Sequence, residues 1–186
     1  MPITDDQNEL FDLVDESDQV IGRISRREAH HNPQLIHRSV GVLVFNRQGE
    51  LFMQKRSLTK DLDAGLWAIS VGGHPSAGQD SQPAAIRELK EELGIESQIS
   101  LVKKYLVRLA TETELQTAYQ TKHNGPFKLN SDEVETGSFF HLEQIEHMVN
   151  RKQMTVSLCS LICLHICLGM FTENTKLKAQ VLKIFR

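Results

Sequence analysis

The sequence predicts an α+β fold in which a mixed β-sheet lies between layers of helices (α/β/α). Three observations lead to this expectation: strand-like runs dominate the middle of the chain, one well-signalled helix interrupts them at 83–94, and helical segments follow from residue 143. Strands and helices in this order are typical of layered domains with a mixed sheet. With 186 residues, the chain suits one domain, and we expect it to span 1–186.

The first part of the chain is predicted to be extended, with one short helical turn. Residues 9–25 form two short strands around a polar turn near Asp18, and residues 25–31 have room for a helical turn before Pro33. Residues 37–46 and 50–56 are apolar runs on either side of a turn that contains glycine. This pattern predicts a β-hairpin.

The central helix is the element with the clearest boundaries. A strand is expected at 67–71 before Gly72 and Gly73, and Pro83 suits the first turn of a helix that ends at Gly94. The remaining expected elements, in order, are strands at 98–109 and 114–121, a loop at 122–135, a strand at 137–142 and helices from Glu143 onward.

The most apolar segment, 156–171, raises the question of a membrane span. It is shorter than the ~20 residues that a span needs, and polar residues and Gly169 interrupt it, so a buried helix is favoured. The three cysteines, Cys159, Cys163 and Cys167, recur at every fourth position here and would form one helical stripe. We interpret that stripe as core packing.

Composition narrows the class of protein. Hydrophobic residues make up 40% and charged residues 24%, which is ordinary globular usage. The formal net charge of -3 gives no basic footprint for nucleic acid or for an anionic membrane, so neither is an expected partner. The first ten residues lack a secretory signal pattern. We therefore expect a cytoplasmic protein, and its oligomeric state, monomer or homodimer, stays open.

Acidic residues gather on the central helix. At about 100° per residue, Ile86, Leu89 and Leu93 fall on one side, whereas Glu88, Glu91 and Glu92 share the other. The helix is expected to be two-faced, with an exposed acidic ridge. With Arg87 and Lys90 nearby, that ridge could simply be a solvated surface.

A divalent cation would give the acidic ridge a purpose. Like charges at i,i+3 and i,i+4 each cost a few tenths of a kcal/mol, and a bound cation removes that repulsion. Carboxylates suit Mg²⁺ or Mn²⁺, and Mg²⁺ is commonly shared between carboxylates and substrate phosphates. The ridge therefore indicates a metal site that holds a polyphosphate.

The spacing from Gly73 to Ile95 resembles the Nudix signature, G-x5-E-x7-R-E-U-x-E-E-x-G-U, in which U is aliphatic. One fixed position differs, because Gln79 stands where the family has its first glutamate. The resemblance implies a Nudix fold, a mixed β-sheet sandwiched between α-helices. It also implies Mg²⁺ or Mn²⁺ ligands at Glu88, Glu91 and Glu92, with the backbone carbonyl of Gly72 facing the metal. Gln79 offers an amide oxygen without charge.

Residues 9–145 are similar to the Nudix branch that contains type I isopentenyl diphosphate isomerase and its hydrolase relatives. That likeness implies a second metal, Zn²⁺ or Mn²⁺, whose ligands by local motif are His30, His37, His74, Glu112 and Glu114. It further implies that Arg56 and Lys60 contact a diphosphate. Taken singly, each histidine is more often a hydrogen-bonded residue than a ligand.

One departure bears on the reaction. The isomerase uses a cysteine two positions before the histidine of "GHP", together with a glutamate, and this chain has Gly72 there. Glycine has no proton to give, so the familiar acid/base pair is disfavoured.

We therefore expect a Mg²⁺- or Mn²⁺-dependent hydrolase that cleaves a small-molecule diphosphate or a nucleoside di- or triphosphate. Glu91 or Glu92 is the expected general base, with Glu133 or Glu135 in reserve. Two alternatives stay open: an isomerase-like enzyme that works through Glu114, and a non-catalytic module that binds a nucleotide or prenyl diphosphate.

Overall fold

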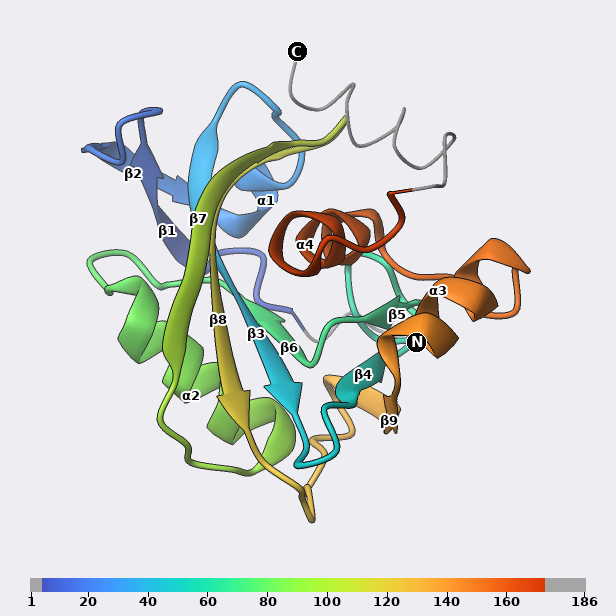
Figure 1. The fold of residues 1–186 in the computed structure, drawn as a ribbon. Helices are drawn as coiled ribbons and strands as arrows, with labels where there is room; N and C mark the ends of the chain where they lie inside the picture. The colour runs from blue at the N-terminus through green and yellow to red at the C-terminus, as the bar shows by residue number, and fades with distance from the viewer. Residues whose placement is uncertain (1–4, 173–186) are drawn as a thin grey trace.

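The computed structural model describes residues 5–172, and the expected domain extends beyond them at both ends. Nine strands and four helices occur within this range (Figure 1). In chain order they are β1 (Leu10–Val14), β2 (Val20–Ser25), α1 (Arg26–Ala29), β3 (Ile36–Phe45), β4 (Leu51–Arg56), β5 (Trp67–Ala68), β6 (Val71–Gly73), α2 (Ser81–Leu93), β7 (Ser100–Arg108), β8 (Thr113–Lys122), β9 (Val134–Phe140), α3 (Leu142–Asn150) and α4 (Leu158–Leu168).

Strand β3 is the centre of a mixed sheet. It pairs antiparallel with β1 and β6 and parallel with β8, whose other edge pairs antiparallel with β7. Its side chains alternate between two cores, because Val40, Val42 and Val44 face the core under α2 whereas Leu43 faces the core under α4. Figure 1 shows α2 and α4 on opposite sides of these strands. The expected layered arrangement is confirmed.

The expected hairpin at 37–56 forms only at its turn. Strands β3 and β4 share a single residue pair, Phe45 with Leu51, and β4 then pairs with β5 and β9 instead. Ser70 holds the diverging strands together, because its hydroxyl accepts from Val44 N–H at 2.8 Å and donates to Phe52 O at 2.5 Å. The chain around Ser70 therefore interrupts the strand expected at 67–71 and leaves β5 and β6 as two short pieces.

The central helix starts and ends close to the expected positions. Pro83 lies in the first turn of α2, and Gly94 terminates it in a left-handed conformation with φ 67°. Helix α1 is one turn long and has a capping box between Ser25 and Glu28. Strand β9 begins three residues earlier than expected, so Glu135 lies in a strand instead of a loop.

The apolar C-terminal segment forms the buried helix α4. Ile162, Cys163 and Leu164 are fully buried against β3, β4 and β7 residues of the same core. Within residues 5–172, no helix is both long and apolar enough to cross a membrane. The cysteine stripe divides, however: Cys163 is core, whereas Cys159 lines a cavity.

Candidate active site and metal cluster

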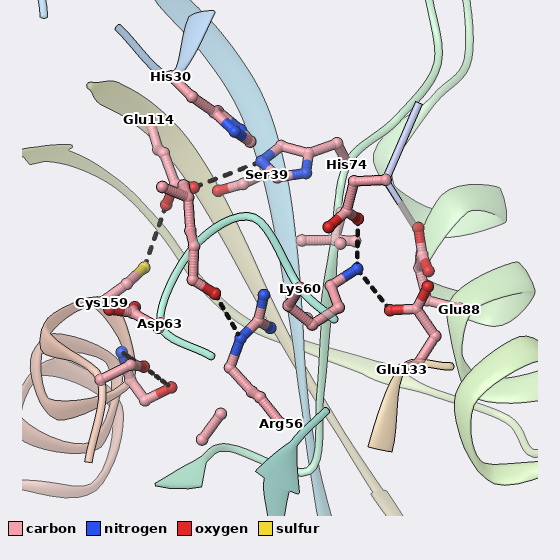
Figure 2. A pocket seen from close by; sticks show the side chains of 18 of the residues that line it. His30, Ser39, Arg56, Lys60, Asp63, His74, Glu88, Glu114, Glu133 and Cys159 are labelled. Atoms are coloured by element: carbon pink, nitrogen blue, oxygen red, sulfur yellow. Dashed lines mark hydrogen bonds and ion pairs between the residues drawn. The ribbon is translucent and has the colours of Figure 1, made fainter. Parts of the chain in front are cut away.

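A cavity of about 320 Å³ lies where the sheet, α2 and the start of α4 meet. Its walls carry most of the residues that the sequence singled out, and Figure 2 shows how their side chains converge. Two groups share this space. Glutamates of α2 lie on one side, and a cluster of histidines and glutamates lies on the other.

Helix α2 does not present its glutamates as one exposed ridge. Ile86, which was expected to face the core, is 38% exposed, whereas Glu92 is only 3% exposed. The buried face is set by Ala85 and Leu89, and positions 85, 88, 89 and 92 are spaced i, i+3, i+4 and i+7. Glu88 and Glu92 therefore point toward the sheet, which corrects the expected orientation of the helix.

Glu92 is held by two hydrogen bonds beside the cavity. Its carboxylate accepts from Gln54 Nε2 at 2.6 Å and from the Gly72 backbone N–H at 3.2 Å. Burial raises the pKa of Glu92 to about 8, and the neighbouring Glu88 adds to that rise. Gly72 itself lines the cavity, between this carboxylate and strand β3.

Glu88 and Glu91 line the cavity and share one arginine. Arg87 lies 3.0 Å from Glu88 Oε1 and 2.7 Å from Glu91 Oε2. Burial raises the pKa of Glu88 to about 7, although Arg87 opposes the rise. Gln79, at the departure from the signature, accepts from the same arginine at 3.4 Å and from Ser76 N–H at 3.2 Å.

The histidines and glutamates of the second group come together from distant parts of the chain. His30 follows α1, His37 lies in β3, His74 follows β6, Glu112 immediately precedes β8, and Glu114 is its second residue. Ligand atoms of the three histidines lie within 4.8 Å of one another, and so do those of His37, Glu112 and Glu114. Phe11 stacks on His74 and His37 at centroid distances of 4.8 and 5.6 Å.

The donor set of this His/Glu cluster fits a divalent cation. Among the described residues, both ring nitrogens of His37 and Oε2 of Glu112 are buried without a hydrogen-bond partner. Such atoms are costly unless something binds them. Burial lowers the pKa of His37 to about 3 and that of His74 well below its ordinary value, which keeps both imidazoles in the neutral form that binds metals.

The two expected phosphate-binding residues both line the cavity, but their charged groups have different partners. Arg56 uses Nε to donate to Leu62 O at 3.1 Å. Lys60 is buried, and its ammonium already contacts Glu133 at 2.6 Å and the carboxylate of Asp5. The positive charge of Lys60 is thus compensated by the protein itself.

Asp5 is bound much as an external anion would be. Besides Lys60, its carboxylate contacts Arg26 Nη2 at 3.2 Å and accepts the backbone N–H of Asp61 at 2.9 Å. No local pattern predicted this contact, because Asp5 and Lys60 are 55 residues apart in the chain.

Cys159 is another cavity residue that sequence reasoning missed. It was assigned to core packing with its apolar neighbours, although two serines at 157 and 160 already marked this end of the segment as polar. The reserve bases also separate: Glu133 lines the cavity, whereas Glu135 pairs with Lys55 at 2.9 Å.

The sequence of this chain is similar to those of known proteins. Residues 35–158 match the model of the NUDIX domain family. The isopentenyl-diphosphate Delta-isomerase 2 of Photorhabdus laumondii is 32% identical over 148 residues, which cover 77% of this chain and 83% of that protein.

Solved structures share the fold at lower sequence identity. DR0079 from Deinococcus radiodurans superimposes with a TM-score of 0.74 at 22% identity and covers 86% of this chain and 99% of its own. The MutT protein from Methanosarcina mazei gives 0.57 at 23% identity over 66% of this chain and 85% of its own.

Proposed function

Because the chain belongs to the Nudix family, we propose that it is a metal-dependent hydrolase that cleaves the diphosphate bond of a small organic or nucleoside diphosphate. One observation carries this proposal. Glu88 and Glu91 of α2 and the His/Glu cluster face the same cavity of about 320 Å³. Carboxylates and imidazoles on both sides of so small a space suit a polyanion bound through divalent cations.

The α2 glutamates have two roles in this proposal. Glu88, Glu92 and the Gly72 carbonyl would hold Mg²⁺ or Mn²⁺, while the His/Glu cluster would hold Zn²⁺ or Mn²⁺. Bound cations supply charge that polarises a phosphoryl oxygen and lowers the pKa of a water. Glu91 lines the cavity, and its side chain is 51% exposed. We propose Glu91 as the general base that accepts the proton of the attacking water, and Glu133 as the alternative.

The cationic side chains position the substrate. Arg56 offers the part of its guanidinium beyond Nε to a phosphate, in the fork geometry that suits such oxygens. Lys60 contributes when a phosphate takes the place of the Asp5 carboxylate. The proposed cations then offset the negative charge of Glu88, Glu91 and Glu133, which would otherwise repel the ligand.

An isomerase-like reaction is the second candidate. The named relative is an isopentenyl-diphosphate Delta-isomerase, and in this chain the thiol of Cys159 lies 3.1 Å from Glu114 Oε2 in the cavity. A thiol is therefore present although position 72 is glycine. It comes from a different wall of the cavity, so an isomerase would need a different arrangement of acid and base.

A screen separates the two reactions. Phosphate or pyrophosphate release is measured with Mg²⁺ and Mn²⁺ over nucleoside diphosphates, nucleoside triphosphates, dinucleotides and prenyl diphosphates, with metal analysis of the purified protein. Release that Glu91→Gln abolishes supports the hydrolase. Deuterium uptake from heavy water into a prenyl diphosphate without phosphate release supports the isomerase. Tight binding without either reaction supports a binding module.

A further inference from the structure

Cys159 makes a direct contact with the His/Glu cluster. Its S–H donates to Glu114 Oε2 with an Sγ–Oε2 distance of 3.1 Å. Figure 2 shows this bond on the cavity wall, with His74 on the other oxygen of the same carboxylate. The thiol comes from α4, just beyond the residues that match the family model.

The first turn of α4 fixes the thiol in place. Ser157 N–H donates to Trp67 O at 2.8 Å, and Ser160 Oγ accepts Ile69 N–H at 3.1 Å. Ser157 Oγ donates to Ser160 Oγ at 2.8 Å and completes the anchor. Because Cys159 lies between these two serines, its position is set by the sheet and does not depend on side-chain contacts alone.

Glu114 Oε2 is the nearer of the two acceptors recorded for the thiol proton. The nearest alternative, Gln116 Oε1, is 3.8 Å from the sulfur and already accepts the Tyr105 hydroxyl at 2.5 Å. The S–H bond is therefore directed at Glu114. The thiol belongs to the surroundings of a cluster whose buried ligand atoms, including Glu112 Oε2, lack partners among the described residues.

The two glutamates of the cluster are consequently not equivalent. Glu114 has Oε2 bound to the thiol, while its Oε1 lies 3.5 Å from His74 Nε2. Glu112 Oε2 faces His30 and His37 at 3.6 and 3.8 Å. Oε1 of Glu114 is thus the oxygen directed toward His74, while Oε2 is bound to the thiol.

We propose that Cys159 is a positioning residue that holds Glu114 with Oε1 toward a divalent cation of the His/Glu cluster. The proposal rests on the proposed metal binding by that cluster and adds a residue that lies outside both the signature and the residues that match the family model. Partners behind a metal ligand fix its orientation, and their loss typically weakens metal affinity 10- to 100-fold. Helix α4 would thereby contribute directly to the metal site.

The test is a titration with Co²⁺, followed by visible absorption in the presence of excess Mg²⁺. Wild type is compared with Cys159→Ala, Cys159→Ser and, as a matched control, Cys167→Ala on the same helix. Cys159→Ala should weaken Co²⁺ binding about 10- to 100-fold. Cys159→Ser should stay within a few-fold of wild type, since its hydroxyl also donates, and Cys167→Ala should match wild type. Thermal unfolding without metal verifies that each variant folds.

Three results would overturn the proposal. Equal affinity of wild type and Cys159→Ala would show that Glu114 needs no support. A sulfur-to-cobalt charge-transfer band that Cys159→Ser loses would make the thiol a ligand. If no Co²⁺ binds, or if the Co²⁺ that binds does not require His30, the metal site itself is contradicted. Only this third result also contradicts the proposed second metal, so the two failures are distinguishable.

Discussion

Gly73 lies against the carboxyl group of Glu88 so closely that a β-carbon at position 73 would stand 2.3 Å from Glu88 Cδ. The absence of a side chain there is therefore what lets Glu88 reach the cavity. Glycine is required at this position of the signature because a side chain would collide with Glu88. Backbone conformation is not the reason, since Gly73 does not have a positive φ.

Gly73→Ala should displace Glu88 and lower hydrolysis by about 100-fold, the effect of roughly 1 Å of misplacement in a catalytic site. The fold should survive, because the displaced atoms are the end of a flexible side chain. Steady-state kinetics and thermal unfolding measure the two effects. Gly22→Ala is the control, since its β-carbon would make an ordinary 3.5 Å contact with Leu13. Retained activity in Gly73→Ala would remove Glu88 from the site.

Glu91→Gln should abolish most hydrolysis without destabilising the protein, because a largely exposed side chain contributes within about ±0.5 kcal/mol. Glu92→Ala should instead lower the free energy of unfolding by about 1–3 kcal/mol, since Gln54 and the Gly72 N–H lose their acceptor. Denaturant titrations compare the two variants. An equally stable Glu92→Ala would contradict the structural role of this carboxylate.

The stability of the metal-free protein should depend on pH through Glu92. Burial raises its folded pKa to about 8, above the ordinary value near 4.5, so the folded state binds the proton more tightly. This contribution is present at pH 4.5 and is lost as pH rises through 8. In chelator, Glu92→Gln should therefore gain stability relative to wild type between pH 5 and about 8. If the stabilities of wild type and Glu92→Gln changed with pH in parallel, the pKa of Glu92 would not be raised in the folded state.

Gln79→Glu should leave hydrolysis unchanged or raise it. A carboxylate at this position would attract Arg87, which now contacts Glu88 and Glu91, and would free them for a cation. Values of kcat/KM at several Mg²⁺ concentrations measure the effect. A clear loss would show that the amide has a function of its own, which is not the contact with Ser76 N–H, because a carboxylate would accept that hydrogen bond as well.

Asp5→Ala should lower the Kd for inorganic pyrophosphate several-fold, because the ligand no longer competes with an internal carboxylate. Lys60 and Arg26 keep Glu133 and Asp61 as partners, so no buried charge is left alone. Asp15→Ala is the control, because Asp15 lies outside the cavity lining and its carboxylate accepts the local N–H groups of Ser17 and Gln19. Calorimetry that finds equal affinities would show that Asp5 does not occupy a ligand position.

Local patterns predicted much of the fold. Pro83 and Gly94 located α2, and the spacing of its glutamates pointed to the site before any coordinate was known. The predicted orientation of α2 was wrong because Ile86 was counted as a core residue while the small Ala84 and Ala85, which are fully buried, were not.

Contacts between distant segments could not be predicted. The approach of Cys159 to Glu114 joins residues 45 apart in the chain, and that of Asp5 to Lys60 joins residues 55 apart. Both depend on how the layers assemble, which no short motif encodes. The divergence of β3 and β4 has the same origin, since the Ser70 hydroxyl that links them comes from outside the predicted hairpin.

The anchoring of α4 through Ser157 and Ser160 has a consequence for biosynthesis. These serines are translated after every strand of the sheet, so a nascent chain can assemble the sheet and the α2 glutamates while the wall that carries Cys159 is still missing. The helix that completes this side of the cavity is therefore synthesised after all the strands on which it docks.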